Sequence, residues 1–231
     1  MENPNKIGSI NIQNNDLGYA IINKESLEIN TSKIKALISQ SDYVKSFLNT
    51  PFHSIVCLFS IIPEIKKFIL PKILPILNQK GANYRCINSI YYDKPPGSKW
   101  DLGFHQDIMI NLKHKLDDND FDTWVQKKDF YRVKPPLEVL ENIITIRIHL
   151  DNCTLENGAL RLIPKSHKLG FIDVANYKIE NTVDIETNEG DVLIMNPLLL
   201  HASGNNCTQE KRRIIHLEFS NIDLPWHEAY T

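Results

Sequence analysis

The sequence predicts a mainly β protein (α+β) with helices at its N-terminal end, in which strands enclose a polar interior. Two observations support this prediction. The segments after residue 84 alternate apolar and polar side chains, which is typical of a sheet with two different faces. The segments before residue 80 carry apolar residues at helical spacing or are interrupted by prolines. We therefore expect helical support over about residues 1–80 and a β-barrel core over about residues 84–220.

The composition is that of an ordinary globular protein, with 42% hydrophobic and 23% charged residues in 231. This length predicts a single domain over residues 1–231. The formal charge is −2 and the basic residues are scattered, so we expect no nucleic-acid partner. The four cysteines form no CxxC pair, and the polar N-terminus lacks a secretory signal. These features predict a cytoplasmic protein with reduced thiols, whereas its oligomeric state stays open.

The N-terminal part is expected to be helical after a polar arm and a short strand over residues 18–22. A helix should begin at one of the N-cap residues 30–32, and a second should cover residues 42–48. Four prolines then predict short helices or turns over residues 52–80.

Two apolar stretches raise the question of a membrane. The run over residues 54–62 is shorter than the ~18 residues that a spanning helix requires, so we expect no integral membrane segment. Residues 61–78 are basic and amphipathic, which would suit a helix on a membrane surface. Internal prolines would break such a helix, and an apolar stripe also serves to cover a sheet. We therefore favour a structural role.

The C-terminal part is expected to form the sheets. Three strands are predicted over residues 143–150, 191–195 and 212–219, with a strand and turn between the first two. Residues 113–136 form a long charged insertion without clear strand alternation. A long connection of this kind is often a lid over a site, although its aromatic residues could equally form a peripheral cluster. A second variable loop should lie at about residues 171–188.

Polar side chains share one face of two of these strands. Thr145, Arg147 and His149 face away from the isoleucines between them. In the last strand, Arg212, Ile214 and His216 share one face, and Ile215, Leu217 and Phe219 share the other. Repetition of this pattern favours a barrel-like sandwich with a polar interior pocket.

The stretch WDLGFHQD contains two candidate metal ligands, His105 and Asp107. Residues i and i+2 of an extended segment point to the same side, so an imidazole and a carboxylate can converge on one ion. The pair alone is more often incidental, but His201 in LLLHASGNN offers a third ligand at a strand end. Two histidines and one carboxylate form the facial triad of non-haem Fe(II) oxygenases, which leaves positions open for a co-substrate and dioxygen.

A carboxylate anchor should lie beyond the third ligand. Arg212 follows His201 by eleven residues, and strand alternation turns it, rather than Arg213, towards the polar face. A guanidinium binds a carboxylate bidentately, and Ser203 can donate a hydroxyl to the same group. Arg147 and Thr145 are further candidates for co-substrate binding, with a structural ion pair as the alternative role of Arg147.

These motifs together resemble the phytanoyl-CoA dioxygenase family of Fe(II)- and 2-oxoglutarate-dependent oxygenases. The likeness is carried by GFHQD (residues 103–107), NGALRLIPKSHKLG (157–170), EGDVLIMNPLLLHASGNN (189–206) and the arginine pair 212–213. The resemblance implies a double-stranded β-helix of the jelly-roll or cupin type, flanked by helices. It also implies that iron binds to His105, Asp107 and His201. By the same likeness, Ser203 and Arg212 hold 2-oxoglutarate.

The resemblance further implies hydroxylation of a small-molecule substrate by dioxygen, with release of succinate and CO2. The carboxylate of Asp107 matters here, because related halogenases have a small residue at this position. Lys165 is a departure, since the family's turn usually has glycine there, and lysine suits the turn only if no positive φ is required. The alternative function is a non-catalytic metal- or ligand-binding module on the same barrel.

Overall fold

The computed structural model describes residues 15–47 and 54–230, and its main feature is a pair of sheets backed by helices. The strands are β1 (Tyr19–Ile22), β2 (Ser54–Val56), β3 (Arg85–Lys94), β4 (Leu102–His105), β5 (Ile110–Leu112), β6 (Asp122–Gln126), β7 (Tyr131–Lys134), β8 (Ile143–His149), β9 (Leu160–Leu162), β10 (Val183–Ile185), β11 (Val192–Met195), β12 (His201–Ser203) and β13 (Arg212–Ser220). The helices are α1 (Lys24–Leu27), α2 (Thr31–Gln40), α3 (Asp42–Phe47), α4 (Leu58–Ile61), α5 (Lys66–Leu77) and α6 (Leu137–Glu141), with short 3-10 helices at Pro63–Ile65, Gln79–Gly81, Leu155–Asn157 and Ser166–Leu169.

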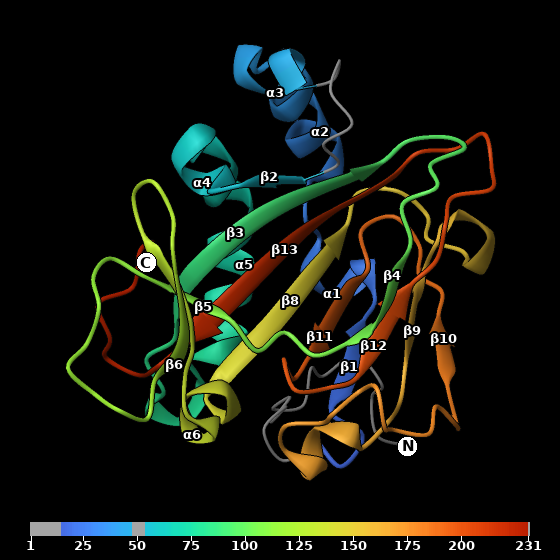
Figure 1. Cartoon of the computed structure of the whole chain (residues 1–231). Helices are drawn as coiled ribbons and strands as arrows, with labels where there is room; N and C mark the ends of the chain where they lie inside the picture. Colours follow the sequence, from blue (N-terminus) through green and yellow to red (C-terminus); the bar gives the residue numbers. More distant parts are fainter. Residues whose placement is uncertain (1–14, 48–53, 231) are drawn as a thin grey trace, which may run out of the picture.

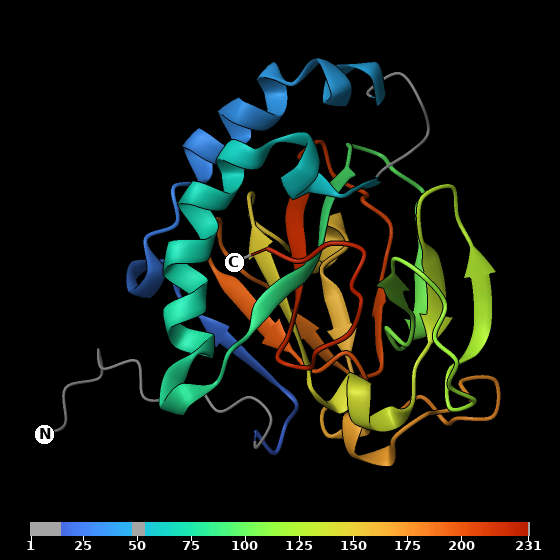
Figure 2. The same ribbon diagram turned by 90° about the vertical axis from the view of Figure 1, so that its left-hand side faces the viewer.

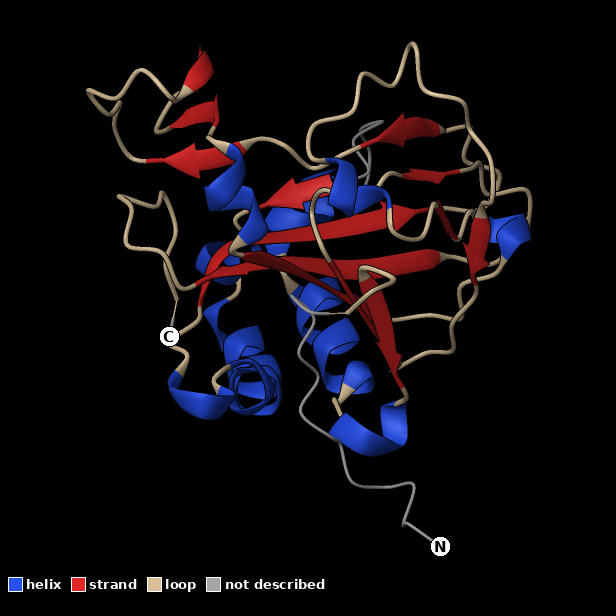
Figure 3. Ribbon diagram, turned by 90° about the horizontal axis from the view of Figure 1, so that it is seen from below, coloured by secondary structure: helices blue, strands red, loops and turns tan. Residues whose placement is uncertain are grey.

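The strands of the described residues form three sheets (Figure 1). The largest has the order β1-β11-β8-β13-β3-β2, the second has the order β10-β9-β12-β4, and the third has the order β5-β7-β6. Helices cover one face of the six-stranded sheet, and the four-stranded sheet lies on its other side (Figure 3). The mainly β fold with N-terminal helices is therefore confirmed.

The alternation of β8 and β13 divides the interior into an apolar and a polar side. Ile144, Ile146 and Ile148 of β8 belong to the large core that the six-stranded sheet forms with the helices. Leu217 and Phe219 of β13 join the same core. The intervening residues of both strands point towards the four-stranded sheet and are buried as well. Polar side chains are thus enclosed between the two sheets.

The helix α2 begins where the cap residues indicated. The Asn30 side chain accepts a hydrogen bond of 2.9 Å from the amide of Lys33, which satisfies a free donor of the first turn. Ile34 and Ile38 are buried one turn apart against the core. The expected second helix is α3, whose last predicted residue, Leu48, lies outside the described residues. The expected arm over residues 1–14 also lies outside them.

The prediction of short helices or turns over residues 52–80 is right for α4 and for the 3-10 helices Pro63–Ile65 and Gln79–Gly81, and it is wrong for α5 and β2; residues 52–53 lie outside the described part of the chain. Helix α5 has twelve residues and continues through Pro71 and Pro75 (Figure 2), while β2 adds a strand before it. The two prolines are four residues apart and both are exposed, so they share the face turned to solvent. The carbonyls that lose a partner can there be hydrated, which lowers the penalty for proline inside a helix.

The apolar face of α5 is part of the core, because Ile69 and Ile73 are almost fully buried beneath the sheet. The stripe over residues 61–78 therefore covers the sheet. Within residues 15–47 and 54–230, no helix has the length and apolar character needed to cross a membrane.

The insertion over residues 113–136 contains strands that its sequence did not indicate. β6 and β7 pair as an antiparallel hairpin, and β7 also pairs with β5. Trp124 contacts Tyr131 edge to face with ring centroids 6.1 Å apart, and it lies 6.2 Å from Phe121. Trp124 and Tyr131 thus meet, as one of the two expectations required, whereas Phe130 stacks on His227 with ring centroids 4.5 Å apart.

Candidate metal centre

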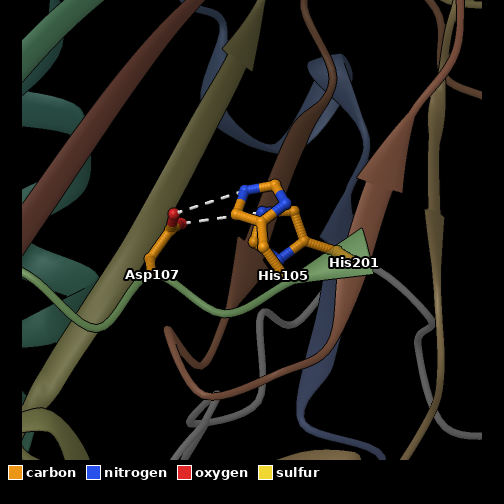
Figure 4. Close-up of side chains that lie close together, drawn as sticks. All are labelled: His105, Asp107 and His201. Carbon is orange, nitrogen blue, oxygen red and sulfur yellow. Dashed lines mark ion pairs between the residues drawn. The ribbon is translucent and has the colours of Figure 1, made fainter. Parts of the chain in front are cut away.

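Two neighbouring strands of the four-stranded sheet carry the candidate histidines. His105 is the last residue of β4 and His201 is the first of β12, and the two stand opposite each other in the antiparallel register. Their ring centroids are 4.3 Å apart (Figure 4). Strand pairing therefore brings together two side chains that lie almost a hundred residues apart in the chain.

Asp107 completes the cluster from the loop that follows β4. Its amide donates a hydrogen bond of 2.9 Å to the carbonyl of Pro197, which holds the loop against the turn before β12. One carboxylate oxygen lies 3.8 Å from Nε2 of His105, and the other lies 3.7 Å from Nε2 of His201 (Figure 4). One ligand atom from each residue lies within 4.8 Å of the other two. The three residues form a possible metal site.

The imidazoles are oriented by the backbone. Nδ1 of His105 donates to the carbonyl of Gly103 at 2.8 Å, and Nδ1 of His201 donates to the carbonyl of Leu199 at 2.9 Å. Each ring therefore carries its proton on Nδ1 and presents the lone pair of Nε2 to the cluster. This is how histidines that bind a metal are usually held.

The charge state of the cluster also suits a cation. Burial, the largest effect, lowers the pKa of His201 to about 4, although Asp107 opposes this change. Burial opposes ionisation of Asp107, but the nearby His201, His216 and His105 together hold its pKa below the usual value. At neutral pH, His201 is thus an uncharged ligand and Asp107 a carboxylate.

The buried oxygen Oδ2 of Asp107 has no hydrogen-bond partner among the described residues. A buried carboxylate oxygen without a donor is costly unless a cation neutralises it. Two imidazole nitrogens and one carboxylate oxygen, with no sulfur, are ligands that suit Fe(II). The residues present therefore fit the expected metal.

A narrow cavity of about 70 Å³ extends from this cluster between the two sheets. It is lined by Tyr92, Trp100, Leu102, His105, Asp107, Arg147, Leu160, His201, Ser203, Arg212 and His216. Arg212 and Ser203 therefore share a cavity with the three candidate ligands. Arg212 is 3% exposed, and its Nε has no acceptor among the described residues.

Lys94 is a residue of this region that the sequence analysis missed. It stands opposite Arg212 in the pairing of β3 with β13, and it is fully buried. Its ammonium group donates to the carbonyl of Gly204 and lies 3.4 Å from the hydroxyl of Ser203. Burial, followed by repulsion from Arg212, lowers its pKa to about 7. The sequence did contain a signal for Lys94: it lies two residues after Tyr92 on β3, so the two side chains point to the same face of the strand.

Arg147 and Thr145 lie on β8, on the polar face as expected. Arg147 lines the cavity, and its NH1 lies 3.1 Å from Nδ1 of His216. Its alternative role was a structural ion pair, but no carboxylate of the described residues lies within 4 Å of Arg147, unlike the pairs formed by Arg85, Arg161 and Arg213. Thr145 is fully buried, its hydroxyl has no partner among the described residues, and it does not line the cavity.

Comparison with known proteins connects the site to one family. Residues 69–214, more than half of the chain, match the family described as phytanoyl-CoA dioxygenase (PhyH). The dioxygenase himG of Aspergillus japonicus is 38% identical over 66 residues, which are 29% of this chain and 20% of that protein. The methylphosphonate hydroxylase of Gimesia maris is 31% identical over 96 residues, which are 38% of this chain and 37% of that protein. These matches span well under half the length of either relative.

Solved structures share the fold at low sequence identity. The non-haem α-ketoglutarate-dependent carbocyclase SnoK from nogalamycin biosynthesis is 16% identical, with a TM-score of 0.64 over 90% of this chain and 81% of SnoK. HygX from Streptomyces hygroscopicus, solved with nickel and 2-oxoglutarate bound, is 16% identical, with a TM-score of 0.62 over 92% of this chain and 86% of HygX. Identities this low establish a common fold.

Proposed function

The chain belongs to the phytanoyl-CoA dioxygenase family, and from this membership we propose that it is a non-haem Fe(II)- and 2-oxoglutarate-dependent dioxygenase that hydroxylates a small molecule. The observation that carries the proposal is the cluster of His105, Asp107 and His201, with its ligand atoms within 4.8 Å of one another and an unpartnered carboxylate oxygen. The likeness to a hydroxylase of Gimesia maris supports the reaction type.

The three residues would hold Fe(II) through Nε2, a carboxylate oxygen and Nε2. Bound iron supplies open coordination positions and redox chemistry, through which dioxygen oxidises 2-oxoglutarate to succinate and CO2 and adds one oxygen atom to the substrate. The backbone carbonyls of Gly103 and Leu199 keep both rings turned towards the metal position. Most of the work of the protein is therefore to orient these groups and to exclude water.

Arg212 and Ser203 would bind the carboxylate of 2-oxoglutarate that is far from the metal. A guanidinium with an unpartnered Nε, buried in the same cavity as the metal ligands, suits a bidentate contact. Lys94 contacts Ser203 and the following carbonyl, so it would hold the serine hydroxyl in place and add positive charge at this end of the cavity.

The test is formation of succinate from 2-oxoglutarate by the purified protein supplied with Fe(II) and air. We expect turnover that depends on Fe(II), including slow turnover without a primary substrate. His105→Ala and Asp107→Ala should each lower it by about 100-fold or more, because each removes a ligand and not only its orientation. His114→Ala is the matched control, because His114 is exposed in the insertion.

Two outcomes would contradict the proposal. One is equal succinate formation by the wild type and by the His105→Ala and Asp107→Ala proteins. The other is a wild type that binds the metal and 2-oxoglutarate but forms no succinate with or without candidate substrates. The second result would favour the non-catalytic binding module.

A further inference from the structure

Arg147 is a buried cation of the cavity that has no anionic partner in the described part of the chain. Only 7% of the residue is exposed, and it lines the cavity together with Asp107. Other arginines of the protein pair with a carboxylate: Arg85 with Asp223, Arg161 with Asp184 and Arg213 with Asp151. A buried guanidinium is costly unless an anion compensates for its lost hydration.

The neighbours of Arg147 orient its guanidinium without neutralising it. NH1 donates to Nδ1 of His216 at 3.1 Å, and Nε2 of the same ring faces Glu218 at 3.4 Å. The guanidinium carbon lies 5.9 Å from the centroid of the Tyr92 ring. The carboxylate of Glu218 thus stands behind the imidazole, and Nε of Arg147 is buried without an acceptor. The guanidinium is therefore held in place, and its Nε–H remains free to donate a hydrogen bond to a ligand.

Arg147 and Arg212 start from different rows of the polar face, and their side chains line the same cavity. Arg212 pairs with Lys94 in the sheet, whereas Arg147 pairs with His216, which is four residues further along β13. At ~3.3 Å per residue, the backbones of the two rows are ~13 Å apart along the strand. Both side chains reach the cavity, where Arg212 is near enough to lower the pKa of Arg147. Lys94 is paired with Arg212 and contacts Ser203. Arg147 instead contacts His216, the residue it is paired with.

In the proposed complex, every negative charge of the metal ligands and the co-substrate therefore has a positive partner other than Arg147. Asp107 and the 2-oxo acid end of the co-substrate would match the two positive charges of the metal. The distal carboxylate of 2-oxoglutarate would match Arg212. No anion of the metal and co-substrate complex remains for Arg147, whose own pKa is lowered to about 10, mainly by burial and then by Arg212.

We propose that Arg147 binds an anionic group of the primary substrate, a carboxylate, phosphate or phosphonate, and so selects small organic anions. The inference rests on the proposed function. An apolar part of such a substrate would lie against Leu102, which lines the cavity and is 42% exposed, and against Leu160. The shared chemistry of these anions is a planar or tetrahedral oxyanion that a guanidinium can bind bidentately.

The test measures binding to protein loaded with Zn(II), which cannot turn over, and saturated with 2-oxoglutarate. Titration calorimetry with propylphosphonate, butyrate and the uncharged butyramide separates the two anion types from the neutral molecule. We expect at least one anion to bind about tenfold or more tightly than butyramide, and Arg147→Gln to remove that preference. The anion that the wild type binds more tightly identifies the anionic group of the substrate as a phosphonate or a carboxylate.

Arg212→Gln is the matched comparison for co-substrate binding. Arg147→Gln should weaken binding of the anion by about tenfold more than it weakens binding of 2-oxoglutarate. Arg212→Gln should weaken binding of 2-oxoglutarate by about tenfold more than it weakens binding of the anion. Arg147→Lys keeps the charge but loses the bidentate contact, so it should weaken the anion by about threefold or more, and it serves as the test if Arg147→Gln does not fold. Thermal unfolding of each variant reports folding.

Three results would overturn the inference. The first is equal binding of the anions and butyramide to the wild type. The second is an Arg147→Gln protein that binds 2-oxoglutarate as weakly as Arg212→Gln does, which would make Arg147 a co-substrate residue. The third is a wild type in which 2-oxoglutarate does not bind in a metal-dependent way, and only this result also removes the proposed function.

Discussion

Two consecutive arginines of β13 have opposite surroundings. Arg213 donates through Nε and NH2 to the two carboxylate oxygens of Asp151, both at 2.7 Å. Arg212 points the other way, into the cavity of the metal cluster. Because successive side chains of a strand alternate, Arg213 forms an ion pair outside the cavity and Arg212 lines the cavity.

The two arginines should therefore separate co-substrate binding from stability. We expect Arg212→Gln to raise the KM for 2-oxoglutarate by about tenfold or more, because the bidentate contact is lost. Arg213→Gln should leave that KM unchanged and lower the free energy of unfolding by about 1–3 kcal/mol, because Asp151 loses its two hydrogen bonds from the guanidinium. Steady-state kinetics and urea unfolding distinguish the two. A larger KM effect in Arg213→Gln would reverse the assignment.

His149 is a buried histidine whose protonation should limit stability in acid. Burial, followed by Arg147, lowers its pKa to about 4, against 6.5 in the unfolded chain. The folded state therefore binds its proton less readily than the unfolded state does. Its contribution to stability is complete above pH 6.5 and is lost as the pH falls from 6.5 to 4.

Replacement of His149 should make the free energy of unfolding fall less steeply as the pH is lowered below 6.5. Between pH 7.5 and pH 5, the metal-free wild type should lose about 2 kcal/mol more free energy of unfolding than His149→Gln, since each pKa unit corresponds to about 1.4 kcal/mol. Urea unfolding at the two pH values measures the difference. Parallel losses in the two proteins would show that another group is responsible.

The turn before the 3-10 helix Ser166–Leu169 does require a positive φ. Lys165 adopts φ 68° and ψ −4°, the left-handed region that favours glycine. Its amide donates to the carbonyl of Leu17 at 3.0 Å, and its ammonium group forms an ion pair with Asp16 at 2.5 Å. The lysine is therefore accommodated at a cost in backbone conformation and gains an exposed ion pair.

Lys165→Gly should stabilise the protein by about 0.5–1 kcal/mol, because relief of the left-handed conformation outweighs an exposed ion pair. A protein of this size would then melt about 1–4 °C higher. Lys165→Ala is the control, since it removes the ion pair and keeps the strained conformation. A lower melting temperature in Lys165→Gly than in Lys165→Ala would contradict the prediction.

At the scale of the whole molecule, the site joins parts that are distant in sequence. The candidate ligands come from β4, the loop after it and β12 in the four-stranded sheet, whereas Arg212 comes from the six-stranded sheet. A metal and 2-oxoglutarate bound together would link the two sheets. Their binding should therefore stabilise the folded protein as a whole.

Removal of metal should lower the melting temperature, and addition of a redox-inert divalent ion with 2-oxoglutarate should raise it. At ligand concentrations ~100 times the Kd, the stabilisation is about 2.7 kcal/mol, or about 5–10 °C here. Differential scanning calorimetry of chelator-treated and loaded protein measures the shift. Asp107→Ala should show almost none of it. An equal shift in that variant would place the bound metal elsewhere.

Some of this architecture follows from local patterns. Period-two alternation was enough to assign Arg212 and Arg213 to opposite faces and to expect a polar interior. Other elements depend on surroundings. α5 continues through two prolines that both face solvent, and β6 and β7 pair as a hairpin in which Trp124 contacts Tyr131. Neither condition is visible in a window of a few residues.

The sequence by itself determined the chemistry of the site: two histidines, one carboxylate and an arginine at spacings typical of one family. Only the tertiary structure decided that His105 and His201 pair across neighbouring strands, that Lys94 stands beside Ser203, and that Arg147 has no anionic partner in the described part of the chain. The reason is physical. Alternation is a property of a single strand, whereas register and burial depend on contacts between segments far apart in the chain.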